Sequence, residues 1–219
     1  MLLYPGFTAQ DLVGPQLMFS STMDRQVHLV AKTLEPVPCD TGFSILPAMT
    51  LAQCPSDLEI LFVPGGSQGT VDAMRDPEIL EFLSDRGSRA TYITAVCTGS
   101  LVLGAAGLLD GYQATTHWAA RDVLPLLGAT PVNERVVIDR NRITGGGVTA
   151  GLDFGLHIVA RLKGEDYARA AQLSFEYAPD PPFNAGTPET AGAEAVAFIE
   201  SLYAPLIESY RQAAREVRT

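Results

Sequence analysis

The sequence is short of positive charge. Only 15 of its 219 residues are Lys or Arg, against 25 Asp or Glu, and the formal net charge is −10 at pH 7. Nucleic-acid-binding proteins need a basic face for the phosphates, so this balance argues against nucleic acid as a partner. No apolar run reaches the length of a membrane span, and we expect no membrane contact.

Cysteine and histidine are also scarce, with three of each. No Cys-x-x-Cys pair or Cys/His cluster has metal-ligand spacing, so we expect neither a metal site nor a disulfide framework. An odd, low cysteine count without a signal peptide is typical of the reducing cytoplasm. Gly65-Gly66 and Gly145-Gly146-Gly147 match neither a phosphate loop nor a dinucleotide-binding loop.

The apolar content predicts a folded protein, since 47% of the residues are hydrophobic and 18% are charged. Strands alternate with helices, which predicts a mainly parallel sheet covered on both faces. We expect one domain over residues 1–219, with a long amphipathic C-terminal helix at about 193–217. The predicted strands are 1–4 (a strand end), 27–32, 60–63, 90–96 and a hairpin of 135–139 with 142–144. Another predicted helix begins near Gly14 or Pro15, and the remaining ones cover 77–86, 100–109, 149–162 and 167–175.

Cys97 is the residue that points most directly to chemistry. A β-branched, apolar run ends at Cys97, and small residues and a helix-like stretch follow. This pattern is typical of a nucleophile elbow, in which a sharp strand-to-helix turn presents one side chain. The helix N-terminus favours thiolate, the nucleophilic form of cysteine. The alternative is a buried core cysteine at a strand end, and the local pattern favours the nucleophile.

The topology gathers further candidates around Cys97, because ligands bind at the carboxyl ends of parallel strands. Asp11 follows the first predicted strand; if its carboxyl reaches the thiolate it must be protonated, and it then serves as a proton donor. A helix-capping or solvated aspartate is the more common outcome at such a position. The N–H groups of Gly65, Gly66 and Thr98 form a possible oxyanion pocket, with an ordinary turn as the equal alternative.

His117 is the one histidine in a polar, motif-like setting, between two threonines and Trp118. It is a candidate base for Cys97, and with Trp118 a candidate contact for the substrate. A lone histidine is more often a hydrogen-bonded structural residue, so geometry must decide between the two roles.

Several segments together resemble the DJ-1/PfpI superfamily, and within it the isocyanide hydratase branch. The superfamily resemblance lies in residues 64–66, 95–99, 114–118 and 144–153. The resemblance to the hydratase branch lies in residues 11–15, 97–109 and 176–186.

The resemblance implies a flavodoxin-like three-layer α/β/α sandwich, a homodimer, and catalysis without metal or organic cofactor. It implies that a small isocyanide is hydrated to an N-substituted formamide through a thioimidate on the cysteine. Cys97 carries over as the nucleophile, Asp11 as the acid beside it and Thr98 as a polar contact. Gly66 carries over as an amide donor and Val148 as a residue of the helix near the cysteine.

Other functions of the superfamily remain alternatives. Thr98 stands where the PfpI-type peptidases have histidine, which disfavours a protease. A redox-sensing protective protein would oxidise the same cysteine, and a glyoxalase-like enzyme would use it on small dicarbonyls. The ligand-sensing domain of an AraC-type regulator shares the elbow, but that interpretation needs a helix-turn-helix module, and only one long helix is predicted after Gly192.

Overall fold

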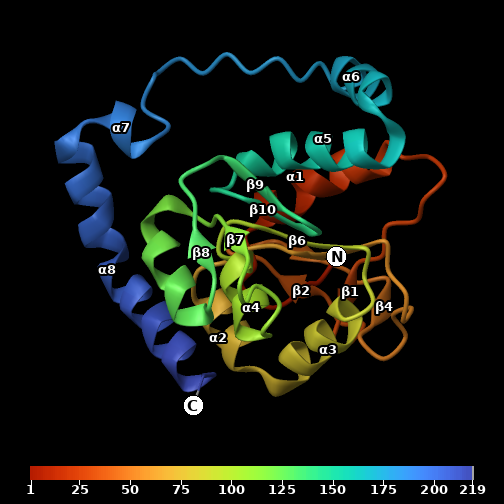
Figure 1. Ribbon diagram of the computed structural model, residues 1–219, viewed down its shortest axis with the longest axis horizontal. Coiled ribbons are helices and arrows are strands. Elements are labelled where there is room, and N and C mark those ends of the chain that lie inside the picture. Colours follow the sequence, from red (N-terminus) through yellow and green to blue (C-terminus); the bar gives the residue numbers. More distant parts are fainter. Residues whose placement is uncertain (219) are drawn as a thin grey trace.

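A computed structural model describes residues 1–218, and Figure 1 shows a sheet between two groups of helices. The four-stranded part of this sheet has the strand order β5-β6-β10-β9. β5, β6 and β10 are parallel, and β9 is antiparallel to β10. Short apolar strands of this kind are typical of a sheet buried on both faces. Their bounds are β5 (Ile60–Val63), β6 (Tyr92–Val96), β9 (Val136–Asp139) and β10 (Arg142–Gly145).

The N-terminal segment extends this sheet. The Leu2 N–H donates to the Phe62 carbonyl at 2.9 Å and the Leu3 N–H to the Val30 carbonyl at 2.7 Å. The segment therefore lies between β5 and β1 (Val30–Ala31), which pairs in parallel with β4 (Met49–Thr50). The strand predicted at 1–4 is present only as these hydrogen bonds and one isolated bridge between Leu2 and Val30. The strand predicted at 27–32 is also shorter than expected, because β1 covers only Val30–Ala31.

Helices cover both faces of the sheet, which confirms the mixed α/β sandwich (Figure 1). One group is α1 (Ala9–Ser20), α5 (Ala150–Lys163) and α6 (Glu165–Ser174). The other group is α2 (Gln68–Arg75), α3 (Pro77–Gly87), α4 (Gly99–Ala105), the 3₁₀ segment η1 (Trp118–Leu127) and α8 (Ala193–Glu216). The remaining short elements are β2 (Val37–Pro38), β3 (Ser44–Ile45), β7 (Gln113–Ala114), β8 (Thr130–Pro131) and α7 (Pro188–Ala191).

Three helical segments, α1, α2 and η1, differ from the sequence-based expectation. α1 begins at Ala9, five residues before Gly14, so that Asp11 lies in its first turn instead of a loop. Pro15 inside α1 misled the prediction, because proline usually marks a helix start or break. The segments α2 and η1 were not predicted; η1 is a 3₁₀ segment that contains Pro125, and such segments lack the 3.6-residue apolar period.

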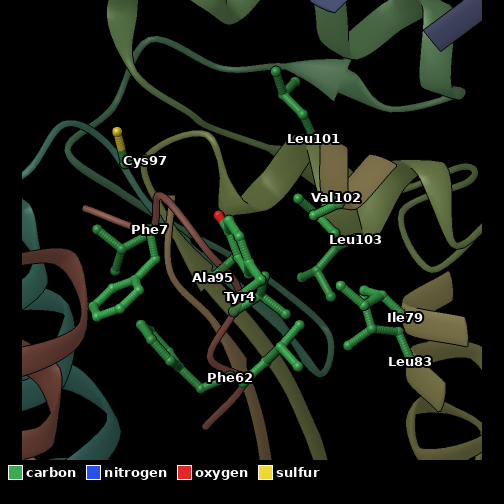
Figure 2. Close-up of a cluster of buried hydrophobic side chains, with 14 of the residues drawn as sticks. Tyr4, Phe7, Phe62, Ile79, Leu83, Ala95, Cys97, Leu101, Val102 and Leu103 are labelled. Carbon is green, nitrogen blue, oxygen red and sulfur yellow. The ribbon is translucent and has the colours of Figure 1, made fainter. Parts of the chain in front are cut away.

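One cluster of buried apolar side chains draws residues from Leu2 to Ala214, and Figure 2 shows part of it. Cys97 lies at its edge with the sulfur turned away from the labelled apolar side chains. The assignment of a single domain over residues 1–219 stays a prediction. Among residues 1–218, no helix combines the length and the apolar character that crossing a membrane requires.

Candidate active site

Cys97 occupies a sharp turn between β6 and α4. Its φ is +57°, in the left-handed region that non-glycine residues seldom adopt. Hydrogen bonds hold this backbone on both sides: the Cys97 N–H donates to the carbonyls of Gly145 at 3.1 Å and Gly146 at 2.8 Å. The Cys97 carbonyl accepts the Thr116 hydroxyl at 2.7 Å and the Ser100 N–H at 3.3 Å. The strained conformation at the junction confirms the predicted nucleophile elbow.

Glycines let the neighbouring turn approach the elbow closely. A Cβ at Gly99 would lie 2.3 Å from the Val63 carbonyl oxygen, and a Cβ at Gly65 would lie 2.7 Å from both Asp11 Oδ2 and the Thr98 nitrogen. No side chain fits at these distances. The ends of β5 and β6 and the first turn of α1 therefore meet at one point.

The structure places the Asp11 carboxyl against Cys97. Asp11 is fully buried, and its Oδ2 accepts the Gly65 N–H at 3.0 Å. Burial raises the pKa of Asp11 to about 7, although its interactions with the Cys97 thiol and the Gly65 N–H lower it; the nearby Asp40 charge adds to the increase. Among residues 1–218, Asp11 Oδ1 has no hydrogen-bond partner of regular geometry. Asp11 can therefore carry a proton near neutral pH beside the sulfur.

The thiol of Cys97 is harder to ionise than the helix N-terminus led us to expect. Cys97 is only 6% exposed. Burial raises the pKa of the Cys97 thiol well above its usual value, and so does the Asp11 charge, while the Thr98 N–H lowers it. A thiolate forms most easily when Asp11 holds a proton, because two adjacent buried anions repel each other. The cysteine and the carboxyl thus act as one pair that shares its protons.

The Thr98 hydroxyl is committed to the Gly66 peptide. It donates to the Gly66 carbonyl at 2.8 Å and accepts the Gly66 N–H at 3.0 Å. The Thr70 hydroxyl is its third hydrogen-bond partner, at 2.8 Å. Because the Gly65 N–H binds Asp11, neither glycine amide is free as the expected oxyanion donor. Of the three predicted N–H groups, that of Thr98 is the one directed at the sulfur.

A cavity of about 160 Å³ adjoins Cys97. Five of the predicted site residues line it: Gly66, Cys97, Thr98, His117 and Val148. Asp11 and Gly65 do not line the cavity and instead support the cysteine from the protein side. Trp118 differs from the expectation, because it lines a neighbouring groove.

His117 is held as a neutral ring. Burial lowers its pKa, and the positive charge of Arg121 lowers it further. Its Nδ1 accepts the Ala119 N–H at 3.3 Å, which leaves the ring proton on Nε2. In this tautomer the Nε2–H group of His117 is a hydrogen-bond donor, and the ring forms part of the cavity wall. The ring also contacts the rings of Trp118 and Tyr203, with 5.8 Å between centroids in each pair. The geometry favours the structural role over that of a base.

The C-terminal helix contributes a wall that sequence analysis did not assign to the site. Tyr203, Leu206, Ile207 and Tyr210 of α8 line the cavity. The sequence predicted an amphipathic helix here, yet Leu202, directly before Tyr203, is exposed. Periodicity shows which residues share a helix face, but it does not show what that face covers.

Tyr210 ties this helix to the turn that approaches the elbow. Its buried hydroxyl donates to the carbonyl oxygens of Gly66 at 2.8 Å and Ser67 at 3.2 Å. The Gly66 carbonyl therefore accepts from both Tyr210 and Thr98. Thr8 and Asp40, from the loops before α1 and between β2 and β3, complete the polar part of the cavity wall.

Comparison with known proteins decides the family, because the DJ-1/PfpI family model matches residues 1–161. The chain belongs to the DJ-1/PfpI family. A DJ-1/PfpI relative with a curated activity is the isonitrile hydratase of Pseudomonas putida, 51% identical over 89% of this chain and 85% of that protein.

The solved structures of DJ-1/PfpI proteins agree with this fold. A ThiJ/PfpI family protein from Pseudomonas syringae is 55% identical and superposes with a TM-score of 0.97, over 98% of this chain and 88% of that one. A more distant relative is the HTH-type transcriptional regulator GbdR of Pseudomonas aeruginosa, 31% identical over 80% of this chain. The match spans only 49% of that regulator.

Proposed function

We propose that this chain is an isocyanide hydratase, which converts R–N≡C to an N-substituted formamide. The observation that carries the proposal is the buried Cys97–Asp11 pair beside a small cavity of about 160 Å³. The 51% identity to the isonitrile hydratase of Pseudomonas putida, over most of both chains, supports the same activity. A simple isocyanide is small enough for this compact cavity, where Val148, Leu206 and Ile207 provide apolar contacts for its substituent.

The first step joins the sulfur to the terminal carbon of the isocyanide. The Cys97 thiolate attacks that carbon, and a proton from Asp11 is added to it, which gives the thioimidate R–N=CH–S–Cys97. Asp11 accepts the thiol proton before this step and donates it during the step, so the pair supplies both nucleophile and acid. Covalent attack replaces one difficult addition of water by two easier additions.

The second step adds water to the thioimidate carbon. The nitrogen gains a proton, the carbon gains the hydroxyl group, and the tetrahedral species R–NH–CH(OH)–S–Cys97 forms. Breaking the carbon–sulfur bond releases R–NH–CHO, and the hydroxyl proton returns to the Cys97–Asp11 pair. The sum is one isocyanide and one water consumed for each formamide, with no oxidant or reductant, so the route requires no cofactor.

The identity to a curated isonitrile hydratase favours this enzyme over the redox-sensor alternative. Both chemistries need the Cys97 thiolate, and burial raises the pKa of the Cys97 thiol, so turnover of an isocyanide is the observation that separates them. A small neutral isocyanide can enter the cavity and meet the sulfur there.

We also propose a homodimer. Large apolar side chains are exposed along α1, α6, the following segment and the first half of α8. These are Val13, Leu17, Leu173, Phe183, Phe198 and Leu202. Exposed apolar surface of this kind commonly marks a subunit interface.

Sedimentation tests the dimer. We expect twice the chain mass for the parent and a shift toward one chain mass for Phe198→Ser, and a monomeric parent would contradict the dimer.

We also propose that the protein resides in the cytoplasm, because its three cysteines are free.

The activity is tested by following formamide production from simple alkyl and aryl isocyanides. We expect turnover by the parent and by Cys54→Ala, which replaces another buried cysteine outside the site. Cys97→Ala should keep the circular dichroism spectrum of the parent and lose turnover. Formamide production by Cys97→Ala at the parental rate, or none by the parent with any isocyanide, would contradict the proposal.

A further inference from the structure

A groove adjoins the reactive cavity on the side of η1 and α8. It has a volume of about 610 Å³ and shares two lining residues, Tyr203 and Ile207, with the cavity of Cys97. These two side chains therefore belong to the walls of both spaces. A long substituent on an isocyanide whose carbon lies at Cys97 would have to pass them to reach the groove.

The groove combines an aromatic wall with an unsatisfied cation. Trp118 lines one side, and Arg121 follows it on η1. Arg121 Nε is buried and has no hydrogen-bond partner among residues 1–218. Such a donor costs free energy unless an acceptor binds it. A ligand carboxylate satisfies a guanidinium group especially well, because it accepts two parallel hydrogen bonds.

Among residues 1–218 no carboxylate forms an ion pair with Arg121, although its charge acts on the exposed Glu189, which accepts a hydrogen bond from Asn133 of the groove. Arg211 donates to Asp122 at 2.5 Å, so these two groups neutralise each other. Glu200 of α8 also lines the groove and is exposed to solvent. The field of Arg121 reaches the inner cavity, because its charge lowers the pKa of His117 in addition to the effect of burial.

We propose that this groove is an outer substrate subsite, in which Arg121 binds a carboxylate on the substituent of the isocyanide. This inference rests on the proposed hydratase function and adds the substrate class, an isocyanide that carries an acid group away from the reacting carbon. Trp118 and Tyr203 pack against the linker between the two ends. Arg121 is a specificity residue that contacts the substituent, while Cys97 and Asp11 perform the chemistry.

The kinetic test compares a series of straight-chain ω-isocyanoalkanoates with neutral isocyanoalkanes of the same chain lengths. We expect at least one acid of the series to have a KM about tenfold below that of its neutral partner, the size of effect that one hydrogen-bonded ion pair supplies. Arg121→Met should abolish this difference by raising the KM of the acid to that of its neutral partner. Arg215→Met removes an arginine of α8 outside the groove and should behave as the parent.

A binding test has a readout that does not need turnover. Trp118 is the only tryptophan of the chain, so its fluorescence reports directly on the groove. The ω-formamidoalkanoate products should change this fluorescence on Cys97→Ala at lower concentrations than their neutral analogues, and Arg121→Met in that background should remove the preference. Equal binding of all acids and neutral partners would overturn the subsite. Absence of isocyanide turnover, with the acid preference in binding retained, would contradict the hydratase function and not the subsite.

Discussion

The first 161 residues and the C-terminal segment after them contribute to the site in different ways. The first part holds the elbow, the glycine turn and Asp11, all at buried strand or helix ends, and it is the part that the family model matches. The second part is much more exposed, with Leu173 at 80% and Phe198 at 65% exposure. It nevertheless supplies Tyr203, Leu206, Ile207 and Tyr210 to the cavity. The shared family framework therefore holds the proposed reactive pair, and the C-terminal helix forms one wall of the cavity beside it.

The largest effect is expected in the first part, from Asp11→Asn. The amide cannot exchange a proton with Cys97, so kcat/KM should fall about 10²- to 10⁴-fold. Stability should change in the opposite direction, because the folded protein keeps Asp11 neutral up to about pH 7, above its usual value of 3.8. The stabilising effect of the asparagine should grow as the pH rises from about 4 to about 7 and then level off.

Chemical denaturation at several pH values checks this opposition. At pH 8 we expect Asp11→Asn to unfold with a free energy roughly 2 to 4 kcal/mol above the parent. Full activity of the variant, or equal stability at every pH, would mean that Asp11 is not a buried proton carrier.

The pH dependence of the parent sharpens the same claim. Below the pKa of Asp11, both the carboxyl and the thiol keep their protons, and no thiolate is available. We expect kcat/KM to rise about tenfold per pH unit up to about pH 7 and then to form a plateau, because removal of a second proton from the pair is strongly disfavoured. If kcat/KM instead continued to rise with pH up to the ordinary pKa of a cysteine thiol, Cys97 would ionise independently of Asp11.

In the second part, Leu206→Ala should change selectivity more than chemistry. The smaller side chain enlarges the cavity, so kcat/KM for a bulky isocyanide should rise about tenfold relative to a small one. The matched control is Leu173→Ala, on α6 and outside the cavity. Equal effects of Leu206→Ala on large and small substrates would show that α8 does not determine which substrate fits.

The smallest effect is expected from Tyr210→Phe. The lost hydroxyl frees the Gly66 and Ser67 carbonyls, but Thr98 still donates to Gly66. We expect stability to fall by about 1 kcal/mol and kcat by about two- to fivefold. Tyr203→Phe is the control, because the Tyr203 hydroxyl makes no hydrogen bond within residues 1–218. If the two variants had the same stability and the same kcat, the Tyr210 hydroxyl would play no part in positioning the elbow.

The same contrast explains what could be predicted from sequence. The apolar run before Cys97, the small residues after it and the glycine turn are local signals, so the elbow could be anticipated. Asp11 and Gly66 were expected beside it from the strand topology and the family resemblance, since local pattern alone favoured a capping or solvated Asp11. The occupation of the Gly65 and Gly66 amides depends on contacts between distant segments, and no local pattern shows it. The wall from α8 was missed for the same reason, since Tyr210 meets Gly66 across 144 positions of sequence.

The most direct test of the account is the mass of the protein during turnover. An isocyanide should be mixed with the parent and with Cys97→Ala, the reaction quenched with acid, and the chain and its peptides weighed. We predict an increase equal to one isocyanide on the peptide that contains Cys97, absent from Cys97→Ala. Steady formamide production with no adduct on Cys97, and undiminished in Cys97→Ala, would contradict covalent hydration by the elbow cysteine.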